Sequence, residues 1–264
     1  MKGEQISSLQ NSKVKRAVSL QQKSAERRRE GLFVVEGRRE LEHCLQAGLE
    51  VESVFISPEL SGTEQMPQLP PSATVYEVTQ QVYERMAYRG STEGVMAIVR
   101  SRQLTLADLQ LPDAPLIIVL ESVEKPGNLG AVLRSADAAK ADAVIVCDPL
   151  TDLYNPNLIR SSIGAVFTVP TVATTSAECI AWLKARGIKI LTAQLQDSSL
   201  YYDTDMRQGV AIVMGTEATG LTQPWRQAAD AHIRIPMLGQ LDSLNVSVSA
   251  AILLFEAVRQ RQSH

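Results

Sequence analysis

Three stretches of the sequence place glycines and polar side chains directly after short apolar runs. They are ESVEKPGNLGAVLRSADAA (121–139), MGTEATGL (214–221) and IPMLGQLDSLNVSVSAAILLFEAV (235–258). Glycine permits positive φ angles and a close approach between backbone and ligand. Exposed amides in such turns bind carbonyl or carboxylate groups without any side chain. The turn at 214–221 can therefore bind such a group through its backbone, although a glycine loop of this kind is ambiguous when taken alone.

The polar side chains of these stretches have ordinary structural explanations when each is taken alone. Asn128 follows a Pro-Gly turn and is predicted to cap the next helix, with Arg134 about one and two-thirds turns further on. Ser243 or Asn245 is predicted to start a long apolar helix, and two good caps at one helix mouth exceed what capping requires. A solvated arginine and a plain strand–turn–helix connection are the alternatives.

Several common kinds of site are excluded or disfavoured by missing residues. No G-x-x-x-x-G-K-[ST] motif is present, and no G-x-G-x-x-G follows residues 116–120, so a nucleotide hydrolase or a Rossmann dehydrogenase is disfavoured. The chain contains only three histidines, so a catalytic triad that depends on a histidine base is disfavoured. Cys44, Cys147 and Cys179 form no C-x-x-C pair, which predicts reduced, mostly buried thiols and no metal site.

Apolar runs without alternation dominate the second half of the chain. Strands are predicted at 116–120, 143–147, 188–193, 210–214 and 232–236, with helices at 128–140, 156–163, 176–186 and 243–260. Val/Ile-rich runs without alternation are typical of parallel strands covered on both faces. The alternation of strands and helices predicts an α/β domain whose ligand lies at the carboxyl ends of the strands.

The first hundred residues have the pattern of a smaller α/β unit. Strands are predicted at 32–37, 51–57, 73–78 and 94–100. A polar helical stretch follows Asn11 and Ser12 and runs to about Ser24, a short helix is predicted at 79–87, and a further helix runs to Gly48. Residues 101–115 are polar, contain two prolines and are interpreted as a linker. The predicted domains are therefore 1–100 and 116–264.

Charge is unevenly distributed along a chain whose net charge is −3. Residues 1–40 hold ten Lys/Arg against five Glu, a net charge of +5. A basic segment on an acidic protein indicates a polyanion partner, although a solvated helix face is an equal alternative. The chain has no apolar run long enough to cross a membrane and no apolar leader at its start, so we expect a cytoplasmic protein.

Together, N-L-G-x-V-x-R (128–134), G-T-E-A-T-G (215–220) and I-P-M-x-G-x-x-D-S-L-N-V-S-V (235–248) resemble the three motifs of the SpoU (TrmH) branch of the SPOUT methyltransferases. Their order and spacing across residues 115–264 make the combined match specific. Residues 1–100 are more loosely similar to the ribosomal-protein-like RNA-binding domain found before this catalytic domain in many members.

The resemblance implies a fold and an activity. The fold is a mainly parallel sheet whose C-terminal part is tied in a trefoil knot, in a protein that works as a homodimer with its active site completed across the interface. The activity is methyl transfer from S-adenosylmethionine to a ribose 2′-hydroxyl of a structured RNA, with ribosomal RNA favoured over transfer RNA. No metal is implied.

The resemblance also implies roles for individual residues. Arg134 would activate the hydroxyl with help from an RNA phosphate, while the groups that hold it and the ribose in register are Asn128, Glu217, Ser243 and Asn245. The donor would be bound by Gly215, Ile235, Met237, Leu238 and Leu244. The RNA phosphates would be contacted by Lys13, Lys15, Arg16, Arg27, Arg28, Arg29, Arg38, Arg39 and Arg89.

Two other functions remain open at this point. One is a non-catalytic RNA-binding assembly factor, which would not bind the donor; the three intact motifs argue against it. The other is methylation of a base, as in other SPOUT branches, and the residues at 128, 134, 243 and 245 favour ribose.

Overall fold

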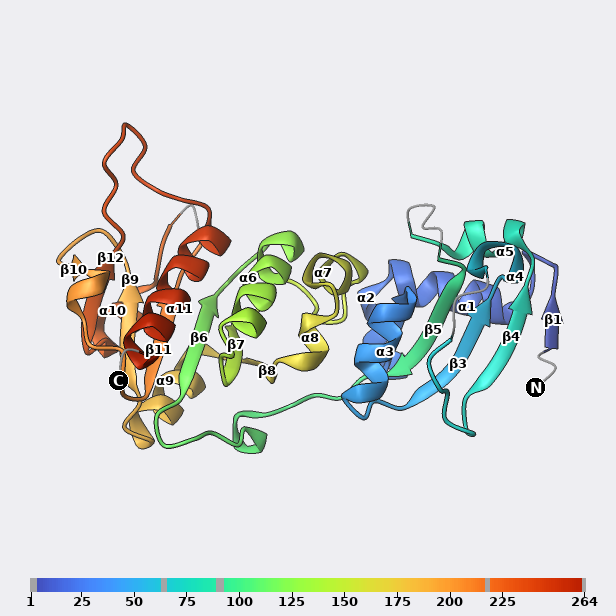
Figure 1. The fold of residues 1–264 in the computed structure, drawn as a ribbon, viewed down its shortest axis with the longest axis horizontal. Helices are drawn as coiled ribbons and strands as arrows, with labels where there is room; N and C mark the ends of the chain where they lie inside the picture. Colours follow the sequence, from blue (N-terminus) through green and yellow to red (C-terminus); the bar gives the residue numbers. More distant parts are fainter. Residues whose placement is uncertain (1–3, 63–65, 89–92, 217–218, 263–264) are drawn as a thin grey trace. The chain divides into compact units, whose positions relative to one another are not determined.

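The computed structural model describes residues 4–62, 66–88, 93–216 and 219–262. The chain divides into two compact units (Figure 1). One contains Met1–Arg102 together with Asp152–Phe167, and the other contains Gln103–Thr151 together with Thr168–His264. Each unit has its own sheet and its own buried core.

The first unit is built on a mixed five-stranded sheet of order β1-β4-β3-β5-β2. Its strands are β1 Glu4–Ile6, β2 Leu32–Glu36, β3 Val51–Ile56, β4 Thr74–Val78 and β5 Val95–Arg100. Its helices are α1 Ser12–Gln22, α2 Ser24–Glu30, α3 Arg38–Gln46, α4 Pro58–Ser61, α5 Gln80–Met86 and α7 Pro156–Ser162, followed by most of α8 Ala165–Thr168. Strands β2 and β3 pair antiparallel with β5, and the other pairs are parallel.

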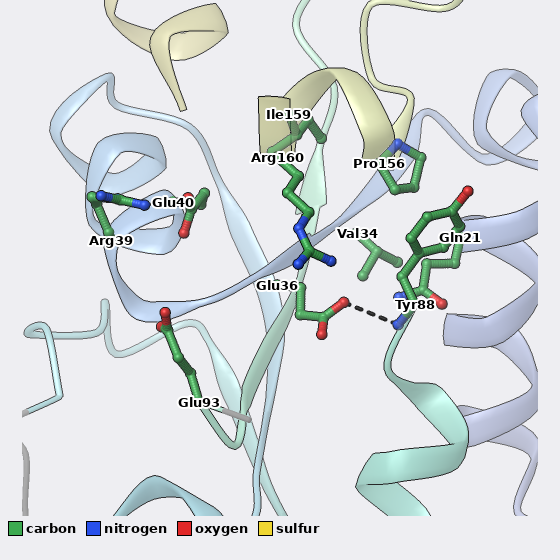
Figure 2. A pocket seen from close by; sticks show the side chains of 10 residues that line it. All are labelled: Gln21, Val34, Glu36, Arg39, Glu40, Tyr88, Glu93, Pro156, Ile159 and Arg160. Carbon is green, nitrogen blue, oxygen red and sulfur yellow. Dashed lines mark hydrogen bonds and ion pairs between the residues drawn. The ribbon is translucent and has the colours of Figure 1, made fainter. Parts of the chain in front are cut away.

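The segment from Asp152 to Phe167 lies in the second half of the sequence but packs in the first unit. The Phe33 ring of β2 stacks on Tyr154 and Phe167, with centroid distances of 4.3 and 5.6 Å. Helix α7 places Ile159 in the same core, beside the strand that carries Val34 (Figure 2). These contacts are between residues far apart in sequence, so no local pattern indicates them.

The second unit contains seven strands. They are β6 Leu116–Glu121, β7 Ala143–Cys147, β8 Thr171–Thr174, β9 Lys189–Ala193, β10 Ser199–Leu200, β11 Val210–Met214 and β12 Ala231–Arg234. The helices are α6 Pro126–Ala138, α9 Ser176–Ala185, α10 Gln223–Ala228, α11 Val246–Gln262 and the short 3₁₀ turns Leu106–Asp108 and Tyr201–Asp203. The predicted α/β class and the parallel sheet are confirmed.

All pairs in this sheet are parallel, in the order β10-β12-β9-β11-β6-β7-β8. The neighbouring strands β6 and β11 lie at the centre of the sheet. After β6 the chain crosses to β7 on one side of this pair, and after β11 it crosses to β12 on the other side. In open α/β sheets the ligand crevice forms at such a switch point, outside the carboxyl ends of the strands. The topology therefore locates the site between the loops that follow β6 and β11.

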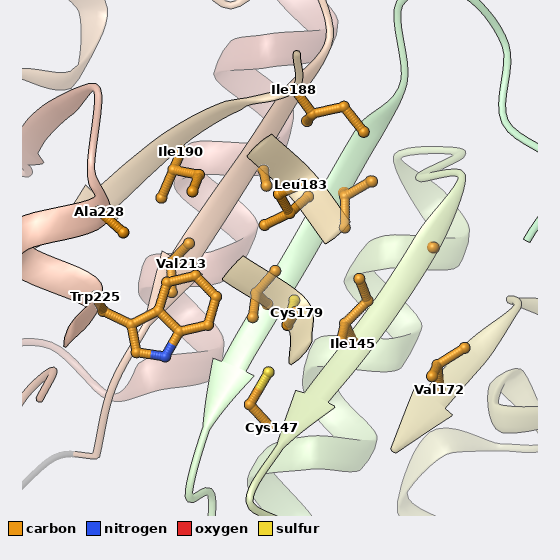
Figure 3. Packing of buried hydrophobic residues seen from close by; sticks show 14 of the residues in the cluster. Ile145, Cys147, Val172, Cys179, Leu183, Ile188, Ile190, Val213, Trp225 and Ala228 are labelled. Carbon is orange, nitrogen blue, oxygen red and sulfur yellow. The ribbon is translucent and has the colours of Figure 1, made fainter. Parts of the chain in front are cut away.

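Alternate residues of the central strands face two helical layers. Ile117 and Val119 of β6 belong to the cluster that contains Leu183 of α9 and Trp225 of α10, both fully buried. Figure 3 shows Leu183 and Trp225 in this cluster. Helices α6 and α11 pack together, and α11 also contacts β6 and β11. Burial on both faces explains why the strand sequences are apolar throughout.

The predicted linker is not an extended tether along its whole length. Residue Leu104 forms a parallel bridge to Val172, and Leu109 is buried against the core of the second unit. A capping box formed by Thr105 and Asp108 shapes the turn between them. The part of the segment from 103 to 111 thus belongs to the second unit, while the domain boundaries given above stay a prediction.

The three cysteines are free and buried, as the sequence predicts. A hydrogen bond with Cys179 and burial raise the pKa of the Cys147 thiol, and burial raises that of Cys44. These effects favour the protonated form of both thiols. Among the described helices, none combines the length and apolar character needed to span a membrane.

Candidate functional site

A cavity of about 360 Å³ lies at the carboxyl ends of β9, β11 and β12 in the second unit. Three chain segments far apart in sequence line it, namely 193–196, the described part of 214–221 and 233–244. The first turns of α11 close it with Val246, Ser249 and Leu253. Two of the three predicted loops therefore meet in one cavity.

The loop after β11 depends on a glycine at position 215. A Cβ built there would lie 2.3 Å from the carbonyl carbon and oxygen of Gly220, which is closer than any side chain allows. The Gly220 amide donates to the Thr216 carbonyl across 3.0 Å, and Gly220 itself has a φ of +67°. The backbones of Gly215 and Gly220 consequently approach each other closely, and both residues line the cavity.

A buried carboxylate anchors the far end of the same loop. Glu121, the last residue of β6, accepts hydrogen bonds from the Thr222 amide at 2.9 Å and from the Thr222 hydroxyl at 2.6 Å. The Ser176 hydroxyl lies 3.4 Å from Glu121, donates to Asp148 at 2.6 Å and accepts from the Trp225 indole at 2.9 Å. No motif in the sequence singles out Glu121, because its importance comes from these tertiary contacts.

A second, smaller cavity of about 130 Å³ adjoins the first. It is lined by residues 122–125 and Asn128 after β6, and it shares Gly215, Thr216 and Val246 with the larger cavity. Across it, Nδ2 of Asn245 donates to Oδ1 of Asn128 at 3.2 Å. All three predicted loops thus converge on one region, at the switch point of the sheet.

The two asparagines differ in how they relate to their helices. Asn245 caps α11 as predicted, since its Oδ1 accepts from the Ser247 amide at 2.9 Å. The prediction that Asn128 caps α6 is wrong. Helix α6 begins at Pro126, and the Asn128 amide donates to the Lys125 carbonyl within the first turn. Proline favours this first helical position, and the Asn128 side chain is thereby used for the contact with Asn245.

Arg134 does not line either cavity. It lies six residues after Asn128 on α6, so the two side chains leave the helix about 120° apart at 3.6 residues per turn. The side chain is exposed, and it makes no hydrogen bond or ion pair with the residues that the structure describes. Within one chain, Arg134 is therefore separated from the site that its motif helps to form.

The predicted donor-binding residues are mostly found in the larger cavity. Gly215, Ile235, Met237 and Leu244 line it, and Ser243 lies beside them, donating to Asp242 at 3.2 Å. Leu238 is different. Its side chain is 95% exposed and does not line the cavity, so the prediction of an apolar wall at Leu238 is not supported by this arrangement.

Gln194 is a lining residue that the sequence did not indicate. Its Nε2 donates to the Gln196 carbonyl at 2.9 Å, whereas its buried Oε1 has no partner among the described residues. A buried acceptor without a partner is unfavourable unless a ligand or water supplies the donor. The cavity thus combines an open acceptor, loop amides and apolar walls, which fits an adenosyl group with donor and acceptor edges and apolar faces.

Two predicted residues cannot be placed. Glu217 and Arg89 both lie outside the described residues. Their predicted roles stay predictions.

The predicted RNA-contacting residues of the first unit fall into distinct groups. Arg27 is only 5% exposed; it pairs with Asp152 at 2.7 Å and donates to the carbonyls of Leu20 and Gln21. This burial corrects its assignment, because a guanidinium that is buried and paired with Asp152 does not reach an RNA phosphate. Arg38 also has internal partners, donating its amide to Glu93 and its guanidinium to the Ser61 carbonyl.

The remaining basic residues of this set are at the surface. Lys15 and Arg28 are exposed, and the residues that form surface ion pairs are Lys13, Arg16, Arg29 and Arg39. The Arg16 guanidinium, which donates to Glu30 at 2.7 Å, lowers the pKa of that carboxyl. Exposed ion pairs contribute little to stability, so an RNA phosphate can replace the carboxylate partner.

Comparison with known proteins decides the family. The sequence profile of the SpoU rRNA Methylase family matches residues 115–255, more than half of the chain. The chain belongs to the SpoU rRNA methylase family. The match covers the predicted motifs, so the resemblance drawn from them is confirmed. The profile of the MRM3-like substrate binding domain matches residues 11–97.

Individual members of the SpoU family are similar over most of the chain. The 23S rRNA (guanosine(2553)-2′-O)-methyltransferase RlmP of Bacillus subtilis is 29% identical over 251 residues, covering 95% of this chain and 98% of RlmP. The 23S rRNA (guanosine-2′-O-)-methyltransferase RlmB of Bordetella pertussis is 36% identical over 193 residues, covering 71% and 79%. The AdoMet-bound rRNA methyltransferase of Sinorhizobium meliloti has a TM-score of 0.87 at 28% identity, covering 98% and 99%.

Proposed function

We propose that this SpoU family member transfers a methyl group from S-adenosylmethionine to a ribose 2′-hydroxyl of ribosomal RNA. The observation that carries the proposal is the convergence of the three motif loops on two adjoining cavities at the switch point of the parallel sheet. The activities for which the RlmP and RlmB relatives are named support it, as does the donor bound in the S. meliloti relative.

The larger cavity is the proposed donor site. Backbone groups at Gly215, Ile235 and Leu244 would bind polar edges of the donor, while Met237 and Leu244 cover its apolar faces. The open acceptor of Gln194 adds a partner for an N–H group. When bound, the sulfonium supplies a methyl carbon that is already electrophilic. The protein therefore has to orient the hydroxyl and help remove its proton, and no metal is needed.

The smaller cavity is the proposed site of the ribose. There the 2′-oxygen would form a bond to the methyl carbon as the carbon–sulfur bond breaks, and the hydroxyl proton would pass to an oxygen of the RNA phosphate or to water. Asn128 and Asn245 are held together and orient the sugar, and Ser243 and Glu217 are proposed to contribute from the neighbouring loops. Arg134 would position an RNA phosphate or stabilise the developing alkoxide, because a guanidinium is a poor base.

We also infer that two copies of the chain form the complete active site. Arg134 leaves α6 away from the cavities of its own chain, so it serves a site only if a second copy brings the two together. Helix α11, which packs on α6, exposes Val248 and Phe255, and an apolar helix face is a natural dimer contact. The C-terminal trefoil knot and a cytoplasmic location are part of the same proposal, by family resemblance.

The RNA would be recruited by the first unit through its exposed basic side chains. Phosphate contacts of this kind weaken as salt rises. Ribosomal RNA is the proposed substrate rather than transfer RNA, since both named relatives act on 23S rRNA.

The deciding experiment is methyl transfer from labelled S-adenosylmethionine to total RNA from a strain that lacks the gene. The labelled RNA is separated by size and digested to nucleosides for mass spectrometry. The proposal expects label in ribosomal RNA and on the ribose. Label on a base would favour base methylation, and label in transfer RNA would identify transfer RNA as the substrate in place of ribosomal RNA. A protein that binds no donor would favour a non-catalytic assembly factor.

A further inference from the structure

The first unit holds a cavity of its own, of about 280 Å³. It lies between the end of α1, the end of β2, the start of α3 and helix α7, and all of its lining residues belong to this unit (Figure 2). Ligand pockets span roughly 300–1,000 Å³, so this cavity suits a small group rather than a helix or a peptide.

Two buried polar atoms of the cavity wall have no partner among the described residues. They are Nε2 of Gln21, a side chain only 5% exposed, and Oε1 of Glu36. The first is a donor and the second is an acceptor. Leaving such groups unpaired is costly, so their presence in one cavity wall points to a ligand that offers an acceptor beside a donor.

The carboxylates around this wall are held in place by the backbone. The other oxygen of Glu36 accepts from the Tyr88 amide at 3.1 Å, and the Glu93 carboxylate accepts from the Arg38 amide at 2.8 Å. Gly37 has a φ of +110°, and a Cβ there would lie 2.5 Å from the buried Glu40 carboxylate. The Glu-Gly pair at 36–37 thus fixes an acidic wall that a larger residue would push out of position.

The cavity wall that holds these polar atoms also contains an aromatic ring and apolar side chains. The Tyr88 ring is fixed at both ends, since its amide binds Glu36 and its hydroxyl accepts from Asn157 at 2.9 Å. Val34, Pro156 and Ile159 add apolar lining. A fixed aromatic ring beside apolar side chains is how proteins hold an unstacked nucleobase.

Two exposed arginines of the cavity favour a ligand that carries a phosphate over a ligand that is only positively charged. Arg39 and Arg160 line the same cavity and are both exposed, so they disfavour a free cation there and attract a phosphate. The two unpartnered atoms are shielded from water, and the Arg160 guanidinium points toward Glu36 (Figure 2), so a ligand that pairs with Glu36 would have to displace this side chain.

We propose that this cavity binds one unstacked guanine of the RNA. The N1–H and N2–H groups of guanine would both donate to the Glu36 carboxylate, and the Gln21 amide would donate to O6. Adenine offers a single amino group on that edge, and inosine lacks the N2 amino group. The inference rests on the proposed function in taking RNA as the ligand, and it adds base selectivity at a site distinct from the methyl-transfer cavities.

The test uses the full chain and three fluorescently labelled pentanucleotides, UUGUU, UUIUU (with inosine) and UUAUU, measured by anisotropy at fixed salt. UUGUU should bind about tenfold or more tightly than either competitor. Glu36→Gln, which replaces the open acceptor by a donor, should remove that preference, and Gln21→Glu should do the same from the other side. Glu50→Gln, which removes a surface carboxylate of the same unit, should keep it.

Equal affinity for guanosine and inosine, no measurable binding of UUGUU, or an unchanged preference in both cavity variants would overturn the inference. Calorimetry with S-adenosylmethionine is run on the same preparations, since the donor cavity lies in the other unit. Normal donor binding and methyl transfer without guanine preference would remove this inference alone. Guanine preference without donor binding would remove the proposed methyl transfer and leave the base site standing.

Discussion

Nδ2 of Asn245 donates to Oδ1 of Asn128 at 3.2 Å and joins two residues that are 117 positions apart in the chain. The bond ties the first turn of α6 to the cap of α11, and Asn128 lines the smaller cavity together with Gly215 and Thr216 of the loop after β11. A single side-chain contact therefore fixes the spacing between the loops that form the proposed ribose site.

Asn128→Ala should lower methyl transfer about 10²-fold, because small displacements of oriented groups have effects of that size. Donor affinity should stay within twofold, since Asn128 does not line the donor cavity. Single-turnover rates and calorimetry with S-adenosylmethionine measure the two quantities. A rate within threefold of the unmodified enzyme would show that the asparagine pair does not orient the substrate.

Arg134→Ala should also lower the rate about 10²-fold or more, as expected for a group that stabilises developing charge. Its side chain is exposed and makes no internal contact among the described residues, so the melting temperature and donor affinity should not change. Lys184→Ala, which removes an exposed cation of α9, is the matched control and should leave the rate unchanged.

The dimer inference makes a separate prediction for the same arginine. Mixing the impaired variants Arg134→Ala and Asn128→Ala should give a rate well above that of either alone, because a mixed pair contains one site with both residues intact if Arg134 acts on the partner copy. If Arg134 serves its own chain instead, the mixed pair has no intact site, and the rate of the mixture would stay as low as that of the two variants.

The parts of the fold that sequence predicts well are those whose pattern is local. The runs 143–147 and 210–214 coincide residue for residue with β7 and β11, because buried parallel strands are apolar at every position. The short edge strands β8 and β10 were missed, since Thr171–Thr174 and Ser199–Leu200 are brief and partly polar. Helix α2, with its sequence SAERRRE, offers no apolar periodicity.

The site shows the same division between local and tertiary information. Glycine spacing and strand ends pointed to Gly215, and a local steric contact explains why. Glu121 and Gln194 lacked any such signal, because their roles depend on partners brought in by the sheet. Arg27 was misjudged for the converse reason: its charge is visible in the sequence, whereas its burial against Asp152 is not.

Gly215→Ala should abolish or weaken donor binding at least tenfold, because the added Cβ collides with the Gly220 carbonyl and forces the loop open. Gly239→Ala is the matched control in the neighbouring loop. A Cβ at Gly239 meets nothing within 4 Å, and its φ is not in the left-handed region. Calorimetry with S-adenosylmethionine should separate the two variants, and equal affinities would mean that the 215–220 turn does not form the donor site.

Asp152→Asn should destabilise the first unit by about 3 kcal/mol, since it leaves the buried Arg27 guanidinium without its counter-charge. Asp205→Asn is the control, because Asp205 pairs with Arg207 at the surface, where ion pairs contribute little. Both tryptophans, Trp182 and Trp225, belong to the second unit, so their fluorescence reports its unfolding while far-ultraviolet circular dichroism reports both units. Urea titration of Asp152→Asn should shift the circular dichroism transition and leave the tryptophan transition in place. A shift of neither transition would mean that the pair does not hold residues 152–167 in the first unit.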